Sequence, residues 1–210
     1  MNEQEYWNKF YSDNVSEKKL TVPSQFAAFV LGETHGIDSI VEFGCGNGRD
    51  SAFFARHGKT VFALDLSSDG IAINQETYAH VSNLKFHACD VTADIPDIGL
   101  NHNEPKAIYA RFFIHALQTE DVAKFFANCS KLMSPQDLFF IEYRTEDDAE
   151  RTKATSAHYR NFLNAAKVEA MLNANGLKTS YLVQGLGFAK WKVDDAFVAR
   201  HIIGTIKNGY

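Results

Sequence analysis

Short apolar runs alternate with stretches of helical periodicity along most of the 210-residue chain. Five of the runs have the length and the β-branched or aromatic content of buried strands: 39–43, 60–65, 84–90, 107–112 and 137–144. Helical periodicity fills four other segments: 51–58, 67–80, 120–133 and 164–176. Strands that alternate with helices predict an α/β fold whose parallel sheet carries helices on both faces.

The last part of the chain has a different pattern. Residues 177–189 and 195–207 are two β-rich runs joined by the short segment KWKVD, and they predict an antiparallel hairpin. With the five earlier strands, the sheet would have seven strands and the hairpin would lie at one edge. Because open sheets of this kind bind ligands at the carboxyl ends of their strands, the loop after the first strand is the expected site.

Charge and cysteine content narrow the function classes. A net charge of −5 without a Lys/Arg run offers no basic surface for nucleic acid. No apolar run approaches the ~20 residues of a membrane span, and the polar, acidic N-terminus is unlike a secretion signal. The three cysteines lie far apart, which indicates reduced thiols and no metal site. We therefore expect a cytoplasmic protein without nucleic-acid partners or a membrane span.

The sequence VEFGCGNGRDS, residues 41–51, follows the first predicted strand and opens a helix. Its alternating glycines would let a ligand lie against bare backbone. A dinucleotide fingerprint requires G-x-G-x-x-G, but the third glycine here, Gly48, comes one position early. Glu42 would repel a pyrophosphate and attract an ammonium group, so the predicted ligand carries a positive amino group.

The motif E-x-G-x-G-x-G, formed by Glu42, Gly44, Gly46 and Gly48, resembles the first motif of class I S-adenosylmethionine-dependent methyltransferases. The second strand ends in Asp65, where this family has an acid that binds both ribose hydroxyls. The resemblance covers nearly the whole chain, and it implies a Rossmann-like sheet and S-adenosyl-L-methionine as cofactor.

Further cofactor contacts follow from the same resemblance. Asp90 ends the third strand, where the family has an acid that binds the adenine amino group, and Val91 matches its backbone partner. The fourth strand matches the segment beside the methionine part of the cofactor. The implied cofactor-binding set is Tyr11, Glu42, Gly44, Cys45, Gly46, Asp65, Leu66, Asp90, Val91 and Ala110.

The N-terminal segment 5–11 places Tyr6, Trp7, Phe10 and Tyr11 on one helical face. One interpretation is a helix docked by its aromatic stripe. The other follows from the resemblance, since a first helix in that family closes over the cofactor. We expect one domain, residues 1–210, made of a helical lid over 1–35 and a Rossmann-like core over 36–210.

Several cations follow the fourth and fifth strands of this acidic protein. The candidates for contact with a methyl acceptor are Arg111, His115, Arg144, His158, Tyr159 and Arg160. One interpretation is that Arg111 and Arg144 form ion pairs with nearby acids such as Glu142, Glu146 and Asp147. The other is an acceptor that bears phosphate or carboxylate, bound by the guanidinium groups.

An acceptor that bears phosphate or carboxylate leaves two catalytic routes open. An anionic oxygen of the acceptor needs no base, whereas a hydroxyl would give its proton to His115, with Arg111 as the second candidate catalytic residue. The chain also resembles small stand-alone methyltransferases found with bacterial cell-surface polysaccharide assembly. This resemblance implies a substrate class only, a small-molecule or glycan-related acceptor. We expect methylation on oxygen.

Two alternatives stay open at this point. An NAD-dependent oxidoreductase would need the dinucleotide glycine spacing and room for a substrate domain. A non-catalytic protein that binds S-adenosylmethionine would bind the cofactor without turnover of any acceptor. Calorimetry with S-adenosylmethionine and NAD separates the first alternative from a methyltransferase, and turnover of an acceptor separates the second.

Overall fold

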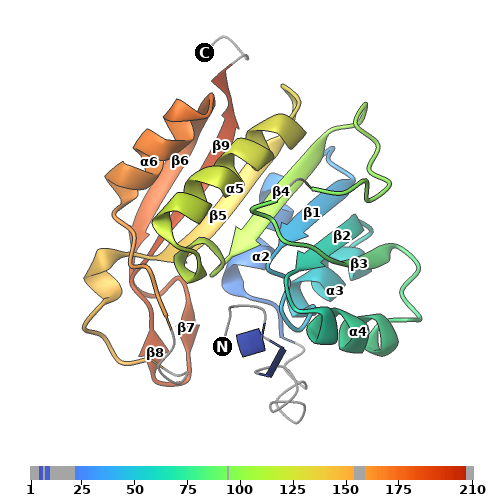
Figure 1. Cartoon of the computed structure of the whole chain (residues 1–210), viewed down its shortest axis with the longest axis horizontal. Helices are drawn as coiled ribbons and strands as arrows, with labels where there is room; N and C mark the ends of the chain where they lie inside the picture. Colours follow the sequence, from blue (N-terminus) through green and yellow to red (C-terminus); the bar gives the residue numbers. More distant parts are fainter. Residues whose placement is uncertain (1–4, 7, 10–21, 94, 154–158, 207–210) are drawn as a thin grey trace. The chain divides into compact units, whose positions relative to one another are not determined.

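The computed structural model describes residues 5–6, 8–9, 22–93, 95–153 and 159–206. Seven strands form one mostly parallel sheet, as the sequence predicts, and two short strands form a second sheet (Figure 1). The chain divides into two compact units, Met1–Lys106 and Ala107–Tyr210.

The first unit contains three parallel strands with β2 between its two neighbours: β1 (Ser39–Phe43), β2 (Thr60–Asp65) and β3 (Leu84–Ala88). Its helices are α2 (Gln25–Glu33), α3 (Arg49–Arg56) and α4 (Ser68–Thr77). Both β1 and β2 are buried along almost their whole length. Strands covered on both faces need continuous apolar runs, which explains the sequence pattern at 39–43 and 60–65.

The residues that precede α3 and α4 determine where these two helices begin. Ser67 caps α4, because its side chain accepts a hydrogen bond from the Gly70 N–H at 3.0 Å. Gly48 precedes α3 with a left-handed φ of 71°, so the helix begins at Arg49, two residues before the predicted start. The chain therefore passes from β1 to α3 through the glycines with no further loop.

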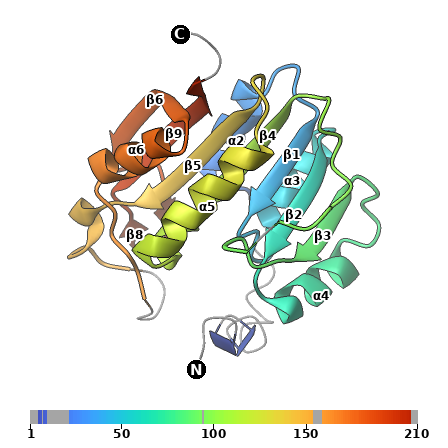
Figure 2. The same cartoon turned by 45° about the horizontal axis from the view of Figure 1, so that its top comes forward.

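The second unit holds four neighbouring strands, which follow one another across the sheet in this order: β4 (Lys106–Arg111), β5 (Leu138–Arg144), β9 (Val198–Thr205) and β6 (Leu177–Gly185). Strands β4 and β5 are parallel, and β9 is antiparallel to both β5 and β6. Helices α5 (Thr119–Leu132) and α6 (Ala165–Ala174) lie side by side over one face of these strands (Figure 2). Two short helices, η2 (Ile114–Ala116) and η3 (Glu146–Asp148), follow β4 and β5.

The predicted C-terminal hairpin is confirmed, with shorter strands than the sequence suggested. Between β6 and β9 lies a second, smaller hairpin of β7 (Lys190–Trp191) and β8 (Asp194–Asp195). The sequence pattern predicted only a simple connection in this segment, because strands of two residues leave no periodicity to detect.

The N-terminal segment is described only in part. Residues 5, 6, 8 and 9 are helical, and the Ser67 hydroxyl donates to the Asn8 side chain at 2.8 Å. Trp7, Phe10 and Tyr11 lie outside the described residues, so the lid remains a prediction. Within the described part of the chain, no helix has the length and apolar character to cross a membrane.

Candidate functional site

The glycine loop turns sharply after β1 and is tied to the neighbouring strand. The backbone N–H groups of Gly44 and Cys45 both donate to the Leu64 carbonyl oxygen, at 2.8 and 3.1 Å. Gly44 and Gly46 have φ values of 70° and 55°, which side-chain-bearing residues rarely adopt. The loop conformation therefore needs glycine at both positions, whatever binds there.

Gly48 has a different reason for being glycine. A Cβ atom at this position would come within 2.9 Å of Phe86 Cζ and 3.0 Å of Tyr78 Cε2. The two rings form a stacked pair with centroids 5.7 Å apart. The third glycine of the motif thus makes room for the protein's own aromatic rings, whereas the sequence suggested one purpose for all the glycines.

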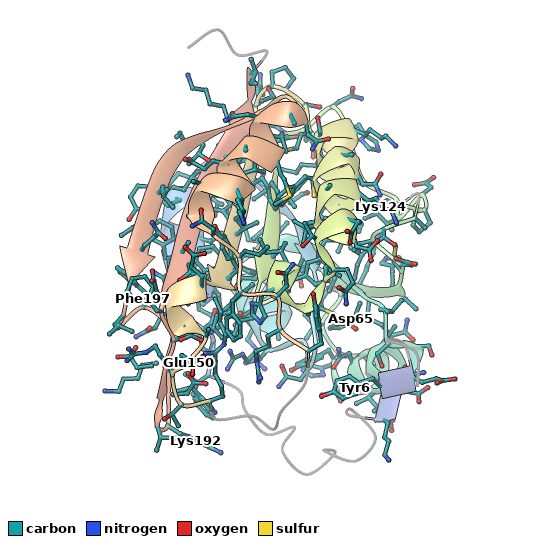
Figure 3. All side chains as sticks on the ribbon, turned by 60° about the vertical axis from the view of Figure 1, so that its left-hand side comes forward. Tyr6, Asp65, Lys124, Glu150, Lys192 and Phe197 are labelled. Carbon is teal, nitrogen blue, oxygen red and sulfur yellow. The ribbon has the colours of Figure 1, made fainter. Side chains whose placement is uncertain are left out.

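Asp65 ends β2 and is labelled in Figure 3. Its Oδ2 accepts a hydrogen bond from the Gly46 N–H at 2.9 Å, and its Oδ1 accepts one from the Ser67 N–H at 3.0 Å. Burial raises the pKa of Asp65, and the hydrogen bonds from Ser67, Gly46 and Leu66 oppose this effect. An ionised carboxylate has about four acceptor positions, so Asp65 can also accept the two hydroxyl groups of a ribose.

Glu42 is a buried acid on β1. Its Oε2 accepts a hydrogen bond from the Ser51 hydroxyl at 2.5 Å. Burial raises the pKa of Glu42 well above its ordinary value, and the negative charge of Asp50 raises it further. A cationic group placed beside this carboxylate would stabilise its charged form, so Glu42 fits the ammonium group of the predicted cofactor.

Asp50, in the first turn of α3, fixes the entry to α2. Its two carboxylate oxygens accept from the N–H and the hydroxyl of Ser24, at 2.8 and 2.7 Å. Ser24 is in turn the N-cap of α2 and accepts from the Ala27 N–H. Asp50 was not among the residues predicted from the sequence. The signal that could have identified it is an acid in the first turn of the helix that follows the glycine motif.

The other predicted cofactor residues of the first unit differ in how far they are exposed to solvent. Asp90 is exposed, and its Oδ1 accepts from the N–H and the hydroxyl of Thr92 at 2.9 and 2.7 Å. Val91 is buried and Leu66 is half-buried. Burial raises the pKa of the Cys45 thiol well above its ordinary value, so it is a small packing residue and not a nucleophile.

Two arginines share one buried carboxylate in the second unit. Arg111 Nε lies 2.8 Å from Glu142 Oε1, and Arg200 Nε lies 2.6 Å from Glu142 Oε2. The Arg111–Glu142 contact is an ion pair that one interpretation of the sequence expected, and Arg200 also donates through Nη2 to the Phe188 carbonyl oxygen at 2.7 Å. Arg200 was not predicted from the sequence. The signal that could have identified it is its charge, because it lies inside the apolar run of a predicted strand.

Phe112 follows β4 with a strained backbone. Its φ of 52° is left-handed, and its N–H donates to the Glu142 carbonyl oxygen at 2.8 Å. The Arg111 guanidinium lies over its ring, with Cζ 4.1 Å from the centroid. Strain of this kind is concentrated at functional sites, where the surrounding structure holds it in place.

His115 is buried in η2, close to Phe112, and the two rings meet edge to face with centroids 5.3 Å apart. Its Nδ1 accepts a hydrogen bond from the Arg144 N–H at 3.3 Å. Its carbonyl oxygen accepts from the Asn161 N–H at 2.7 Å. Both the ring and the backbone of His115 are therefore anchored.

Arg144 forms a buried ion-pair group with acids other than those considered from the sequence. Its Nη1 lies 2.6 Å from Asp148 Oδ2, and its Nη2 lies 2.6 Å from Asp194 Oδ2. Asp148 also accepts from the N–H of Phe197, which Figure 3 labels, at 2.8 Å. Arg144 thus holds β8 and the start of β9 against the end of β5.

The remaining predicted acceptor and cofactor residues of the second unit differ in burial. Tyr159 is exposed and Arg160 is half-buried, whereas His158 lies outside the described residues. Ala110 is buried in β4. Tyr11, the last member of the predicted cofactor set, also lies outside the described part of the chain.

Comparisons with known proteins find similarity to methyltransferases. The family described as "Methyltransferase domain" matches residues 40–136. Phosphoethanolamine N-methyltransferase 1 of Triticum aestivum is 27% identical over 126 residues, covering 58% of this chain and 25% of the relative. Its namesake in Caenorhabditis elegans is 24% identical over 120 residues, covering 57% and 24%. The chain thus spans about a quarter of the length of these curated relatives.

Solved structures show the same fold at low sequence identity. The glycopeptide N-methyltransferase MtfA complexed with S-adenosylmethionine superposes with a TM-score of 0.69 at 14% identity, covering 89% of this chain and 96% of that one. An S-adenosylmethionine-dependent methyltransferase from Clostridium acetobutylicum gives a TM-score of 0.69 at 12% identity, covering 95% and 98%.

The fold and the glycine loop define a Rossmann-like α/β protein, and its residues 40–136 match the methyltransferase-domain family. Together with the acids at the strand ends, the match over residues 40–136 makes this chain similar to S-adenosylmethionine-dependent methyltransferases. S-adenosylmethionine, which is bound in the MtfA structure, is the cofactor that this similarity implies.

Proposed function

We propose that this protein transfers the methyl group of S-adenosylmethionine to a small-molecule or glycan-related acceptor that bears a phosphate or a carboxylate. The observation that carries the proposal for the acceptor is the convergence of Arg111 and Arg200 on Glu142. The proposal for the reaction rests on the methyltransferase domain and on the acids of the glycine loop and β2.

The first unit would hold the cofactor through three kinds of contact. Asp65 would accept the ribose hydroxyls, Glu42 would bind the amino group, and the loop at Gly44 and Gly46 would let the methionine chain approach the backbone. When bound, the sulfonium supplies a methyl group that is already electrophilic. The remaining task of the protein is to orient a nucleophile, which is where most of the rate gain is expected.

The second unit would bind the anionic part of the acceptor. Guanidinium groups bind phosphate and carboxylate through a planar fork of N–H donors, so arginines at this position suit an anionic acceptor. Stacking on Phe112 restricts the orientation of the Arg111 guanidinium. Two relatives are named for phosphoethanolamine as acceptor, which contains a phosphate, and this supports the same class of acceptor.

The test is a screen with S-adenosylmethionine carrying an isotope in its methyl group. Phosphomonoesters and carboxylic acids are each offered beside a neutral counterpart of the same size. We expect incorporation into the anionic compounds and not into their neutral partners. Equal labelling of the neutral partners would contradict the proposed acceptor class, and binding of cofactor without labelling of any compound would favour a non-catalytic protein.

Once the screen has identified an acceptor, Arg111→Ala tests whether Arg111 binds it. Removal of a charge-assisted contact of about 1.5–3 kcal/mol should raise the acceptor KM by at least about tenfold and leave cofactor affinity unchanged. Lys124→Ala, at an exposed cation on α5 that Figure 3 labels, is the matched control. An unchanged KM in Arg111→Ala would remove Arg111 from the acceptor site.

A further inference from the structure

The hydrogen bond between Arg144 and His115 fixes where the histidine ring carries its proton. A backbone N–H can only donate, so Nδ1 of His115, at 3.3 Å from the Arg144 nitrogen, must present a lone pair. A neutral imidazole has one protonated and one unprotonated nitrogen. The proton of neutral His115 therefore lies on Nε2.

The surroundings hold both partners of this hydrogen bond in place. Arg144 is anchored by its ion pairs with Asp148 and Asp194, and the adjacent Thr145 N–H donates to the Phe197 carbonyl oxygen at 3.1 Å. His115 has 4% of its surface exposed. The ring cannot turn to free Nδ1 without breaking the contact and leaving a buried N–H without its acceptor.

This arrangement conflicts with a role for His115 as a general base. A base takes a proton on its unprotonated nitrogen, which in His115 is Nδ1. A second proton there would set two N–H donors against each other, and Nε2 already holds a proton. A hydroxyl acceptor would thus find no available basic nitrogen on this side chain.

We infer that His115 is a hydrogen-bond donor that positions the acceptor, and that the methylated atom brings its own available lone pair, as an amine nitrogen or an anionic oxygen does. This inference rests on the proposed function. The lone pair of that atom forms the new bond to the methyl carbon while the S–C bond breaks, and the bonding electrons stay on sulfur. An amine acceptor reacts in its unprotonated form, after its ammonium group has lost a proton to water, and its product leaves as a methylammonium ion. An anionic oxygen has no proton to lose.

The first experiment tests the tautomer and needs no acceptor. The full chain is labelled with ¹⁵N-histidine, and long-range ¹H–¹⁵N correlation spectra are recorded at about pH 8, where histidine side chains are ordinarily neutral. Comparison with His115→Gln assigns the signals. We expect the proton on Nε2 and an unprotonated Nδ1; a proton on Nδ1 would overturn the inference and leave the proposed function standing.

The second experiment compares three phosphomonoesters of the same length. Phosphoethanolamine carries an amine, 2-hydroxyethyl phosphate a hydroxyl, and phosphoglycolate a carboxylate. Products are identified by mass spectrometry after transfer of the labelled methyl group. Labelling of the amine or the carboxylate compound, but not of the hydroxyl compound, supports the inference and shows which atom is used. Efficient methylation of the hydroxyl oxygen of 2-hydroxyethyl phosphate, identified by fragmentation of the product, would contradict it, whereas a methyl group on a phosphate oxygen would not.

The third experiment uses the acceptor with the highest turnover in the screen. His115→Gln retains an N–H donor near the position of Nε2, whereas His115→Asn retains an acceptor for the Arg144 N–H. We expect the kcat of His115→Gln to stay within about tenfold of the wild-type value. The plot of kcat against pH should have the same shape for both proteins from about pH 5.5 to about 8. Removal of a general base would instead lower kcat by at least about 100-fold and abolish the decrease of kcat at low pH that the wild-type protein would then show. That result would overturn the inference.

Two controls separate these outcomes from other failures. Thermal melting of both variants shows whether the η2 segment still folds, and the tautomer measurement on the wild-type protein does not depend on either variant. If wild-type protein labels no compound in the wider screen, the proposed function fails. The assignment of the His115 proton is then still decided by the spectra.

Discussion

The backbone N–H of Gly46 donates to the Asp65 carboxylate across 2.9 Å and so joins the glycine loop to the end of β2. The Ser67 N–H holds the other carboxylate oxygen at 3.0 Å. The orientation of this acid is thus fixed by the backbone on both sides. An acid positioned in advance loses little further freedom on binding, which favours affinity.

Gly46→Ala should weaken cofactor binding, because alanine is strained at a φ of 55° and relief of that strain moves the N–H that holds Asp65. Gly36→Ala is the matched control, since Gly36 has a φ of 75° and no atom within 4 Å of an added Cβ. Both variants should lose about 1 kcal/mol of stability. Titration with S-adenosylhomocysteine should show weaker binding only for Gly46→Ala; equal effects would mean that the loop geometry is not needed.

Glu42→Gln should bind the cofactor more weakly and yet be more stable without it. Folding raises the pKa of Glu42 through burial and through Asp50, so the folded protein holds this proton more tightly than the unfolded chain does. The stabilising contribution of Glu42 is therefore present below its unfolded pKa and lost as the pH rises through its folded pKa. Glutamine resembles the protonated form at every pH.

Thermal melting at two pH values tests this prediction. At about pH 8 the variant should melt a few degrees above the wild-type protein, and at about pH 4 the gain should disappear. Calorimetry at about pH 8 should show at least about tenfold weaker binding of S-adenosylhomocysteine, because the carboxylate that attracts the ammonium group is gone. A gain of the same size at both pH values would mean that packing, and not ionisation, is responsible.

Much of the fold could be predicted from the chain, because its elements leave strong periodic signals. The runs ending at Phe43 and Asp65 are strands with the predicted bounds. The β7–β8 hairpin could not be predicted. Its position depends on the Arg144–Asp194 ion pair, which joins residues 50 positions apart in the sequence.

The site was predictable in its residue types but not in its interactions. Glu42 and Asp65 could be identified because a motif and a strand end mark them. The partners Ser51 of Glu42 and Arg200 of Glu142 come from distant or unmarked positions. The tautomer of His115 depends on a contact with the backbone at Arg144, and no sequence pattern reports such a contact.

The stability of the second unit should fall in mild acid because of His201. This buried side chain lies with Nε2 3.0 Å from the Tyr143 hydroxyl, and burial lowers its pKa from 6.5 to about 4. The unfolded chain therefore binds a proton more readily, and stability is lost as the pH falls from the unfolded pKa towards the folded one. We expect a loss of up to about 3 kcal/mol between about pH 6.5 and about pH 4.

Urea unfolding as a function of pH measures this effect. His201→Gln removes the titrating group, so its stability should depend less steeply on pH over that interval, whatever its absolute stability. Parallel curves for the variant and the wild-type protein would assign the acid sensitivity to other groups.

Asp194→Ala should destabilise the protein by about 3 kcal/mol, because it leaves the buried Arg144 guanidinium without one of its two carboxylates. Lys124→Ala removes an exposed ion pair with Asp121 and should change stability by less than about 1 kcal/mol. Urea unfolding at neutral pH gives both values. If the two variants lost the same free energy, the Arg144 group would not be a structural anchor.

The most direct test of the cofactor assignment is a calorimetric titration of wild-type protein and Asp65→Ala with S-adenosylhomocysteine. Asp65→Ala removes two charge-assisted hydrogen bonds of about 1.5–3 kcal/mol each before water compensates, so affinity should fall at least about tenfold. Asp69→Ala, at an acid in the first turn of α4, is the matched control and should bind as the wild-type protein does. Equal affinity of wild-type protein and Asp65→Ala would contradict the account of this site.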